Sequence, residues 1–111
     1  MVYIEHFVAQ LWNVDPKILN SRKLLKSTAF DIAKDLKLTI VKTFVHKFEP
    51  HGLSLILVIA ESHLAIHTWP ELSYMNIDIL SCSKETHLNK LEEKLKERFN
   101  NAKITCKKIE Y

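Results

Sequence analysis

The chain has 111 residues, of which 47% are apolar and 26% charged, and its net charge is +3 with neutral histidines. This length supports one hydrophobic core and this composition is that of an ordinary globular protein, so we expect a single domain over residues 1–111. The positive charge is small and dispersed, which argues against a nucleic-acid partner. No apolar stretch approaches the ~20 residues of a membrane helix, so we expect no membrane partner either.

Targeting, redox and metal-binding signals are weak. The N-terminal segment MVYIEHFVAQLW lacks a basic region and contains charged Glu5, so we do not interpret it as a signal peptide. Two cysteines, Cys82 and Cys106, give no disulfide framework, and a reducing cytoplasm is the simplest location. The sequence has no CxxC or HExxH motif and only one glycine, Gly52, so we expect neither a metal site nor a phosphate-binding loop.

The first third of the chain predicts a strand followed by a helix. Apolar residues alternate on both faces of residues 2–12, which indicates a strand covered on both sides. Residues 13–20 form a connector in which Asp15, before Pro16, can start a short helical turn. Asn20 or Ser21 then caps a helix that extends to about residue 36. Its amphipathic stripe comprises Leu25, Ala29, Ile32, Ala33 and Leu36.

The middle of the chain predicts four strands. Residues 38–48 are rich in β-branched and aromatic residues. The turn 49–52 contains a proline and the only glycine, which favour tight turns. Two strands, 53–60 and a short one over 64–68, follow it. The last of the four covers residues 73–82.

The end of the chain predicts a helix and a strand. Ser83 caps a helix through about Phe99, and residues 102–111 form the last strand. The order β-α-β-β-β-β-α-β predicts an α+β fold. We expect a two-layer α/β sandwich, with a mostly antiparallel sheet and both helices on one face. Met75, Ile77 and Ile79 would face the helices, and Cys82 would face away.

Reactive side chains gather in the stretch ESHLAIHTWPE, residues 61–71. It holds two carboxylates, two imidazoles, a hydroxyl nucleophile and an indole, directly after the most apolar strand. Polar groups at the end of a buried strand are held rigidly, as reactive groups must be. Taken singly these residues have ordinary interpretations: His67 as a hydrogen-bonded histidine, Cys82 as a small buried side chain. Their order and spacing are what is specific.

This stretch resembles the processing-site motif of the prokaryotic S-adenosylmethionine decarboxylases, pyruvoyl-dependent enzymes of spermidine synthesis. The resemblance covers about residues 47–82, and includes Phe48, Pro50, Gly52, Ser54, Asp78 and Cys82. It implies an S-adenosylmethionine decarboxylase-like fold. It also implies a self-processing carboxy-lyase that converts S-adenosylmethionine to S-adenosylmethioninamine and CO₂.

Such a reaction needs an electron sink that no ordinary side chain supplies. A ketone that forms an imine with the substrate amine serves, and the resemblance implies that the protein makes this ketone itself. The Ser62 hydroxyl attacks the Glu61 carbonyl, the resulting ester eliminates, and hydrolysis leaves a pyruvoyl group on the second of two chains, 1–61 and 62–111. The resemblance gives His67 as the processing base, Ser54 as a hydrogen-bond partner of the processing intermediate, and Cys82 as the catalytic proton donor. It implies neither pyridoxal phosphate nor a metal.

Substrate recognition is open to two interpretations. Phe48 and Trp69 could stack an adenine from two sides, and Glu71 or Asp78 could attract the cationic substrate. The alternative is the same fold and pyruvoyl chemistry acting on arginine or ornithine. It stays open because the chain departs from the family pattern where loop shape could set the pocket: at Glu5-His6, at Asp35-Leu36-Lys37 and at Ser83.

Strand geometry limits how the site can be built. A straight strand rises ~3.3 Å per residue, which would put Ser62 and His67 ~16 Å apart. A base must come within ~3 Å of the atom it deprotonates, or act through one water. Either the chain turns sharply at Glu61-Ser62 or the histidine comes from another subunit. We expect the turn.

The predicted sheet has more apolar surface than two helices can cover. Strand 53–60 is apolar on both faces, and an uncovered apolar face is typical of a partner surface. We therefore expect a homodimer with sheets face to face. A non-catalytic binding protein would need a broken site, which is not seen. A nucleic-acid-binding module would need aromatic and basic residues together on its strands, and these are not so placed.

Overall fold

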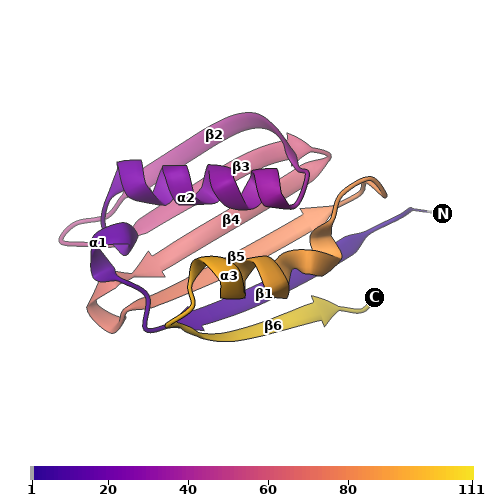
Figure 1. Cartoon of the computed structure of the whole chain (residues 1–111). Coiled ribbons are helices and arrows are strands. Elements are labelled where there is room, and N and C mark those ends of the chain that lie inside the picture. The colour runs from indigo at the N-terminus through magenta and orange to yellow at the C-terminus, as the bar shows by residue number, and fades with distance from the viewer. Residues whose placement is uncertain (1) are drawn as a thin grey trace.

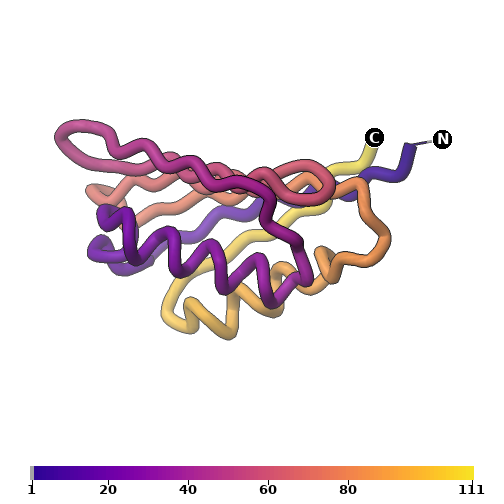
Figure 2. Tube along the Cα trace, turned by 90° about the horizontal axis from the view of Figure 1, so that it is seen from above, coloured from indigo at the N-terminus to yellow at the C-terminus, as the bar shows by residue number. Residues whose placement is uncertain are grey.

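The computed structural model describes residues 2–111, which form one antiparallel sheet of six strands with helices on one side. Along the chain the elements are β1 (Glu5–Trp12), α1 (Pro16–Leu19), α2 (Arg22–Asp35), β2 (Thr39–Lys47), β3 (Leu53–Ala60), β4 (Ser62–Trp69), the 3₁₀ turn η1 (Pro70–Leu72), β5 (Tyr74–Ser81), the 3₁₀ turn η2 (Leu88–Lys90), α3 (Leu91–Arg98) and β6 (Lys103–Ile109). Figures 1 and 2 show α2 and α3 on the same face of the sheet. The expected two-layer α+β sandwich is confirmed.

The strand order is β2-β3-β4-β5-β1-β6. Four consecutive strands, β2 to β5, pair in sequence, whereas β1 lies between β5 and β6. The register places Ala9 of β1 opposite Ile77 of β5 on one side and Cys106 of β6 on the other. The first strand of the chain is therefore enclosed by two strands from its second half.

Local capping chemistry explains where the first helices begin. The Asp15 side chain accepts a hydrogen bond from the Lys17 amide at 2.9 Å, and Pro16 occupies the first turn of α1. The Ser21 hydroxyl accepts from the Leu24 amide at 3.1 Å, so Ser21 is the N-cap of α2. The predicted stripe on α2 is confirmed, because all five of its residues are buried.

The predicted start of the last helix is wrong. Ser83 is not a helix cap, because its hydroxyl accepts from the Glu85 amide two residues on, and this local turn competes with a helix. The His87 amide donates to the Leu36 carbonyl at 2.8 Å, which ties the segment to the end of α2. Helical structure begins only at Leu88, and α3 ends at Arg98.

The predicted length of the fourth strand is also wrong, since β4 runs from Ser62 to Trp69. Paired on both sides by β3 and β5, β4 keeps its ladder through polar residues at both ends, beyond the predicted range 64–68. Because of this extension, Ser62 and His67 lie in one strand, which sets the distance between them.

The core lies between the sheet and the helices. Met75, Ile77 and Ile79 are fully buried there, as expected. Leu53, Leu55, Leu57 and Ile59 alternate inward along β3, while their neighbours face the side without helices. On that helix-free face Phe44, Ile56 and Val58 are 53%, 39% and 37% exposed.

Within residues 2–111, no helix is both long and apolar enough to span a bilayer.

Candidate active site

The tight hairpin between β3 and β4 carries the predicted scissile bond. Ile59 pairs with Ser62, so only Ala60 and Glu61 form the loop. Ser62 has a backbone φ of 116°, a region that residues with a β-carbon rarely adopt. Such a conformation costs on the order of 1–3 kcal/mol and is found where the surrounding structure holds it in place, often at functional sites. The strain lies at the serine whose bond is predicted to break.

The scissile carbonyl is itself held. The Cys82 amide donates a hydrogen bond to the Glu61 carbonyl oxygen at 3.2 Å, and Ser62 pairs with Ser81 across the β4–β5 ladder. The structure thus brings Glu61, Ser62 and Cys82 together at one end of the sheet. A backbone amide aimed at the oxygen of a carbonyl under attack stabilises the negative charge that develops there.

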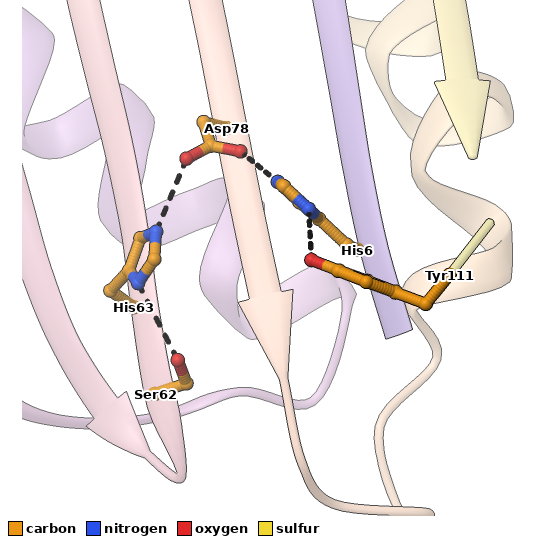
Figure 3. Close-up of polar contacts among 5 residues, drawn as sticks. All are labelled: His6, Ser62, His63, Asp78 and Tyr111. Atoms are coloured by element: carbon orange, nitrogen blue, oxygen red, sulfur yellow. Dashed lines mark hydrogen bonds and ion pairs between the residues drawn. The ribbon is translucent and has the colours of Figure 1, made fainter. Parts of the chain in front are cut away.

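Figure 3 shows a chain of polar contacts that continues from Ser62. The Ser62 hydroxyl lies 3.4 Å from His63 Nδ1, and His63 Nε2 lies 3.2 Å from Asp78 Oδ2. The other oxygen of Asp78 is 2.5 Å from His6 Nε2, and His6 Nδ1 is 2.8 Å from the Tyr111 hydroxyl. Strands β4, β5 and β1 supply the three central residues because they are neighbours in the sheet.

The carboxyl group of Asp78 is ionised more readily than usual. Burial is the largest single influence and raises its pKa, but the hydrogen bonds from His6 and His63 and their electrostatic attraction together outweigh it and hold the pKa below its ordinary value. Both carboxylate oxygens already have an imidazole partner. Asp78 is predicted to attract the substrate, and the structure places it in the network beside Ser62.

We expect this network to make stability acid-sensitive. Because the folded-state pKa of Asp78 lies below its ordinary value of 3.8, its contribution to the free energy of unfolding is complete above that value and disappears as the pH falls through the folded pKa. Urea unfolding of Ser62→Ala, compared with Ser62→Ala/Asp78→Asn at neutral pH and below about pH 4, measures the difference. Parallel dependence of the two proteins on pH would contradict the imidazole contacts.

A second group of predicted residues lies around the β2–β3 turn. Ser54 Oγ is 2.7 Å from His67 Nδ1, because these residues face each other across the β3–β4 ladder. They line a pocket of about 320 Å³ together with Phe48, Trp69 and Glu71. Four of the predicted residues in this group are therefore neighbours of His67.

The turn at Gly52 shapes this pocket. Gly52 has a φ of +103°, and a β-carbon there would lie 3.2 Å from the Thr68 carbonyl oxygen, so another residue would be strained. The Phe48 amide donates to the Gly52 carbonyl at 2.9 Å, which fixes the phenyl-bearing residue at the pocket. Glu71 Oε1 lies 3.0 Å from His51 Nε2 across the same opening.

The residues around Ser62 and those around His67 lie at different ends of β4. The expected turn therefore does not bring Ser62 and His67 together. The sharp bend precedes Ser62, and Ser62 and His67 occupy one continuous strand. Five residues of strand separate them by about 16 Å. His67 therefore cannot act on Ser62 of the same chain, and the expectation of a bend that joins them is wrong.

Three members of the network were not predicted from the sequence: His6, His63 and Tyr111. His63 lies inside the motif, but nothing in the motif indicated its partner. The contact of His6 with Tyr111 joins residues 105 positions apart, and depends on β1 lying between β5 and β6. Residues 2–111 contain no cluster of three or more histidine, cysteine or carboxylate side chains arranged to hold a metal ion.

Comparison with known proteins gives a consistent family. The family model described as S-adenosylmethionine decarboxylase matches residues 5–110. The S-adenosylmethionine decarboxylase proenzyme of Acetivibrio thermocellus is 36% identical over 104 residues, which are 94% of this chain and 84% of the relative. That of Archaeoglobus fulgidus is 32% identical over 99 residues, 89% of this chain and 88% of the relative.

A solved structure supports the fold. The crystal structure of the adenosylmethionine decarboxylase from Aquifex aeolicus VF5 aligns with a TM-score of 0.85 at 24% identity, covering 98% of this chain and 90% of the other. On the family match and the relatives together, the chain belongs to the S-adenosylmethionine decarboxylase family.

Proposed function

We infer that this chain is the proenzyme of a self-processing decarboxylase that acts on S-adenosylmethionine, and that Ser62 is the precursor of its pyruvoyl group. The observation that supports this function best is the set of groups that surround the Glu61-Ser62 bond. The serine hydroxyl is next to an imidazole, its backbone is strained, and the carbonyl before it is held by the Cys82 amide. These are a nucleophile, a base and an activated electrophile within one hairpin.

Processing follows from these positions. The Ser62 hydroxyl oxygen adds to the Glu61 carbonyl carbon, the Cys82 amide steadies the charge on the carbonyl oxygen, and the carbon–nitrogen bond breaks, which leaves an ester and a free amine. A base then removes the α-proton of residue 62, and the ester carboxylate of Glu61 leaves. This elimination separates chains 1–61 and 62–111, and hydrolysis of the unsaturated residue 62 then releases its nitrogen as ammonia and leaves the pyruvoyl group.

A pyruvoyl group at residue 62 supplies the carbonyl that accepts electrons during decarboxylation. The residues present fit this group, since Ser62 provides all its carbon atoms and is the first residue of β4, at one end of the sheet. Cys82 follows Ser81, the ladder partner of Ser62, and carries a free thiol. That position suits a proton donor to the substrate carbon.

The distance between Ser62 and His67 supports a homodimer. Ser54, His67, His63 and Asp78 belong to the rows of side chains on the helix-free face, which also bears the exposed apolar residues. If two sheets pack face to face about a two-fold axis that runs perpendicular to the strands, the Ser62 end of each β4 meets the His67 end of the partner's β4. Each site then contains Ser62 and Cys82 from one protomer, and the partner's pair of Ser54 and His67.

The substrate would lie where these halves meet. Phe48 and Trp69 are 47% and 40% exposed at the mouth of the His67 pocket, so both rings are partly accessible to a base. Glu71 in the same pocket offers a carboxylate to a cationic substrate. The four predicted substrate residues are thus divided, with Asp78 at the Ser62 end and the others at the His67 end.

We expect decarboxylation of S-adenosylmethionine and no turnover of arginine or ornithine. Phe48→Ala should weaken binding of S-adenosylmethionine by about 1–3 kcal/mol, the loss found when a base loses an aromatic stacking partner. Release of CO₂ from each of the three compounds measures the substrate preference, and KM of Phe48→Ala for S-adenosylmethionine measures the loss of binding. Phe30→Ala, which removes an exposed ring from α2 on the opposite side of the sheet, is the control. Turnover of arginine or ornithine alone would favour the amino-acid substrate.

A further inference from the structure

The network of Figure 3 has one consistent arrangement of protons. An ionised Asp78 can only accept hydrogen bonds, so the Nε2 atoms of both His6 and His63 must carry hydrogens. Each neutral imidazole is then left with an unprotonated Nδ1. That atom of His6 accepts from the Tyr111 hydroxyl, and that of His63 faces the Ser62 hydroxyl.

This arrangement gives Ser62 a base whose tautomer is set by a carboxylate. A serine, an imidazole and a buried or half-buried carboxylate in this order form the unit that activates serine nucleophiles in unrelated folds. The Ser62–His63 separation of 3.4 Å is long for a hydrogen bond, as is usual before a reactive complex tightens. The low pKa of Asp78 keeps the carboxylate ionised, which the tautomer requires.

Processing needs proton removal at two different atoms of residue 62. The hydroxyl must lose its proton before ester formation, and the α-carbon must lose one before elimination. Within a protomer His63 is beside the hydroxyl, whereas His67 is about 16 Å along the strand. The two steps therefore have different histidines available to them.

Resting on the proposed self-processing, we propose that His63 is the base for ester formation in its own protomer, and that Asp78 and His6 are positioning residues for it. His63 Nδ1 takes the proton as the oxygen–hydrogen bond of Ser62 breaks and the oxygen–carbon bond to Glu61 forms. The same proton passes to the amide nitrogen as the carbon–nitrogen bond breaks. No proton is gained or lost overall, and no co-reactant is needed.

The test distinguishes whether the Glu61-Ser62 linkage in a variant is still an amide or has become an ester. Hydroxylamine cleaves esters readily and leaves peptide amides intact. Full-length His63→Asn should process about 10²–10⁴-fold more slowly than the natural chain and should resist hydroxylamine, because its Glu61-Ser62 bond remains an amide. Asp78→Asn should behave in the same way, since an amide can donate to the ring and reverse its tautomer. Asp78→Glu should restore part of the rate.

Two controls make the result specific. His87→Gln changes a histidine that precedes η2 and whose amide bonds to the end of α2, and should process normally. Mixing His63→Asn with Ser62→Ala, whose own His63 is intact, should not restore cleavage, because His63 acts within its protomer. Processing kinetics by intact mass spectrometry give every readout, and circular dichroism checks that each variant is folded.

Three outcomes would overturn the assignment: normal processing of His63→Asn, accumulation of a hydroxylamine-sensitive ester in it, or normal processing of Asp78→Asn. The last also covers the case in which His63→Asn does not fold. Failure of the proposed function looks different, because the natural chain would then remain uncleaved under all conditions.

Discussion

Ser62→Ala is expected to remain one chain of 111 residues indefinitely, whereas we expect the natural protein to separate into chains 1–61 and 62–111. Without a hydroxyl there is no oxygen to receive the Glu61 acyl group, so neither ester nor pyruvoyl group can form. Decarboxylation should be lost with it, since no other side chain supplies the electron sink. Intact mass spectrometry after long incubation measures the first effect, and CO₂ release the second.

The matched control for this variant is Ser27→Ala, which removes an exposed hydroxyl from α2 on the other side of the sheet. It should cleave and turn over substrate at the natural rate. Cleavage of Ser62→Ala at the same bond would show that another nucleophile acts there. A natural chain that stays intact would remove the proposed processing altogether.

Mixing two inactive proteins is expected to restore cleavage. His67→Ala retains Ser62 but should process about 10²–10⁴-fold more slowly, because elimination lacks its base. Ser62→Ala retains His67 but has nothing to cleave. In a mixed dimer the partner's His67 faces an intact Ser62, so about half of the chains that carry Ser62 should be cut at the natural rate after random pairing.

The control for this experiment replaces Ser62→Ala by the double variant Ser62→Ala/His67→Ala, which offers no histidine and should restore nothing. Subunits can be exchanged by unfolding and refolding the mixture, and the two variants have different masses. If cleavage is not restored although mixed dimers form, His67 does not act across the interface. The helix-free face would then need another explanation for its exposed Phe44 and Ile56.

Local patterns predicted most elements of the fold. The apolar stripe on α2 and the alternation along β5 each mark the face that packs on the core. The spacing of apolar residues in the sequence is enough to predict such a face. The segment after Ser83 was predicted wrongly, because side-chain bonding to a nearby amide outweighs the apolar spacing that begins only at Leu88. The place of β1 between β5 and β6 could not be predicted, since pairing partners are not encoded in a strand's own alternation.

The site was predicted in parts. The family resemblance implied roles for Ser62, His67 and Cys82, and strand rise indicated that the first two could not meet in a straight segment. The expected bend between Ser62 and His67 is wrong because β4 was predicted too short, whereas its ladder to β3 and β5 begins at Ser62. His6 and Tyr111 had no local signal, because their contacts depend on the order of strands in the sheet.

The enclosed position of β1 has a consequence for the life of the protein after cleavage. Chain 1–61 would contribute β1, β2 and β3, and chain 62–111 would contribute β4, β5 and β6, so the strands of the two pieces interleave across the sheet. Neither piece can leave without breaking ladders on both sides of β1. A continuous chain finds this arrangement by a first-order search, whereas separated pieces must first meet in solution. The interleaved strand order of the mature enzyme would therefore form before cleavage, in the continuous chain. Once denatured and diluted, the two cleaved chains would regain that strand order only slowly.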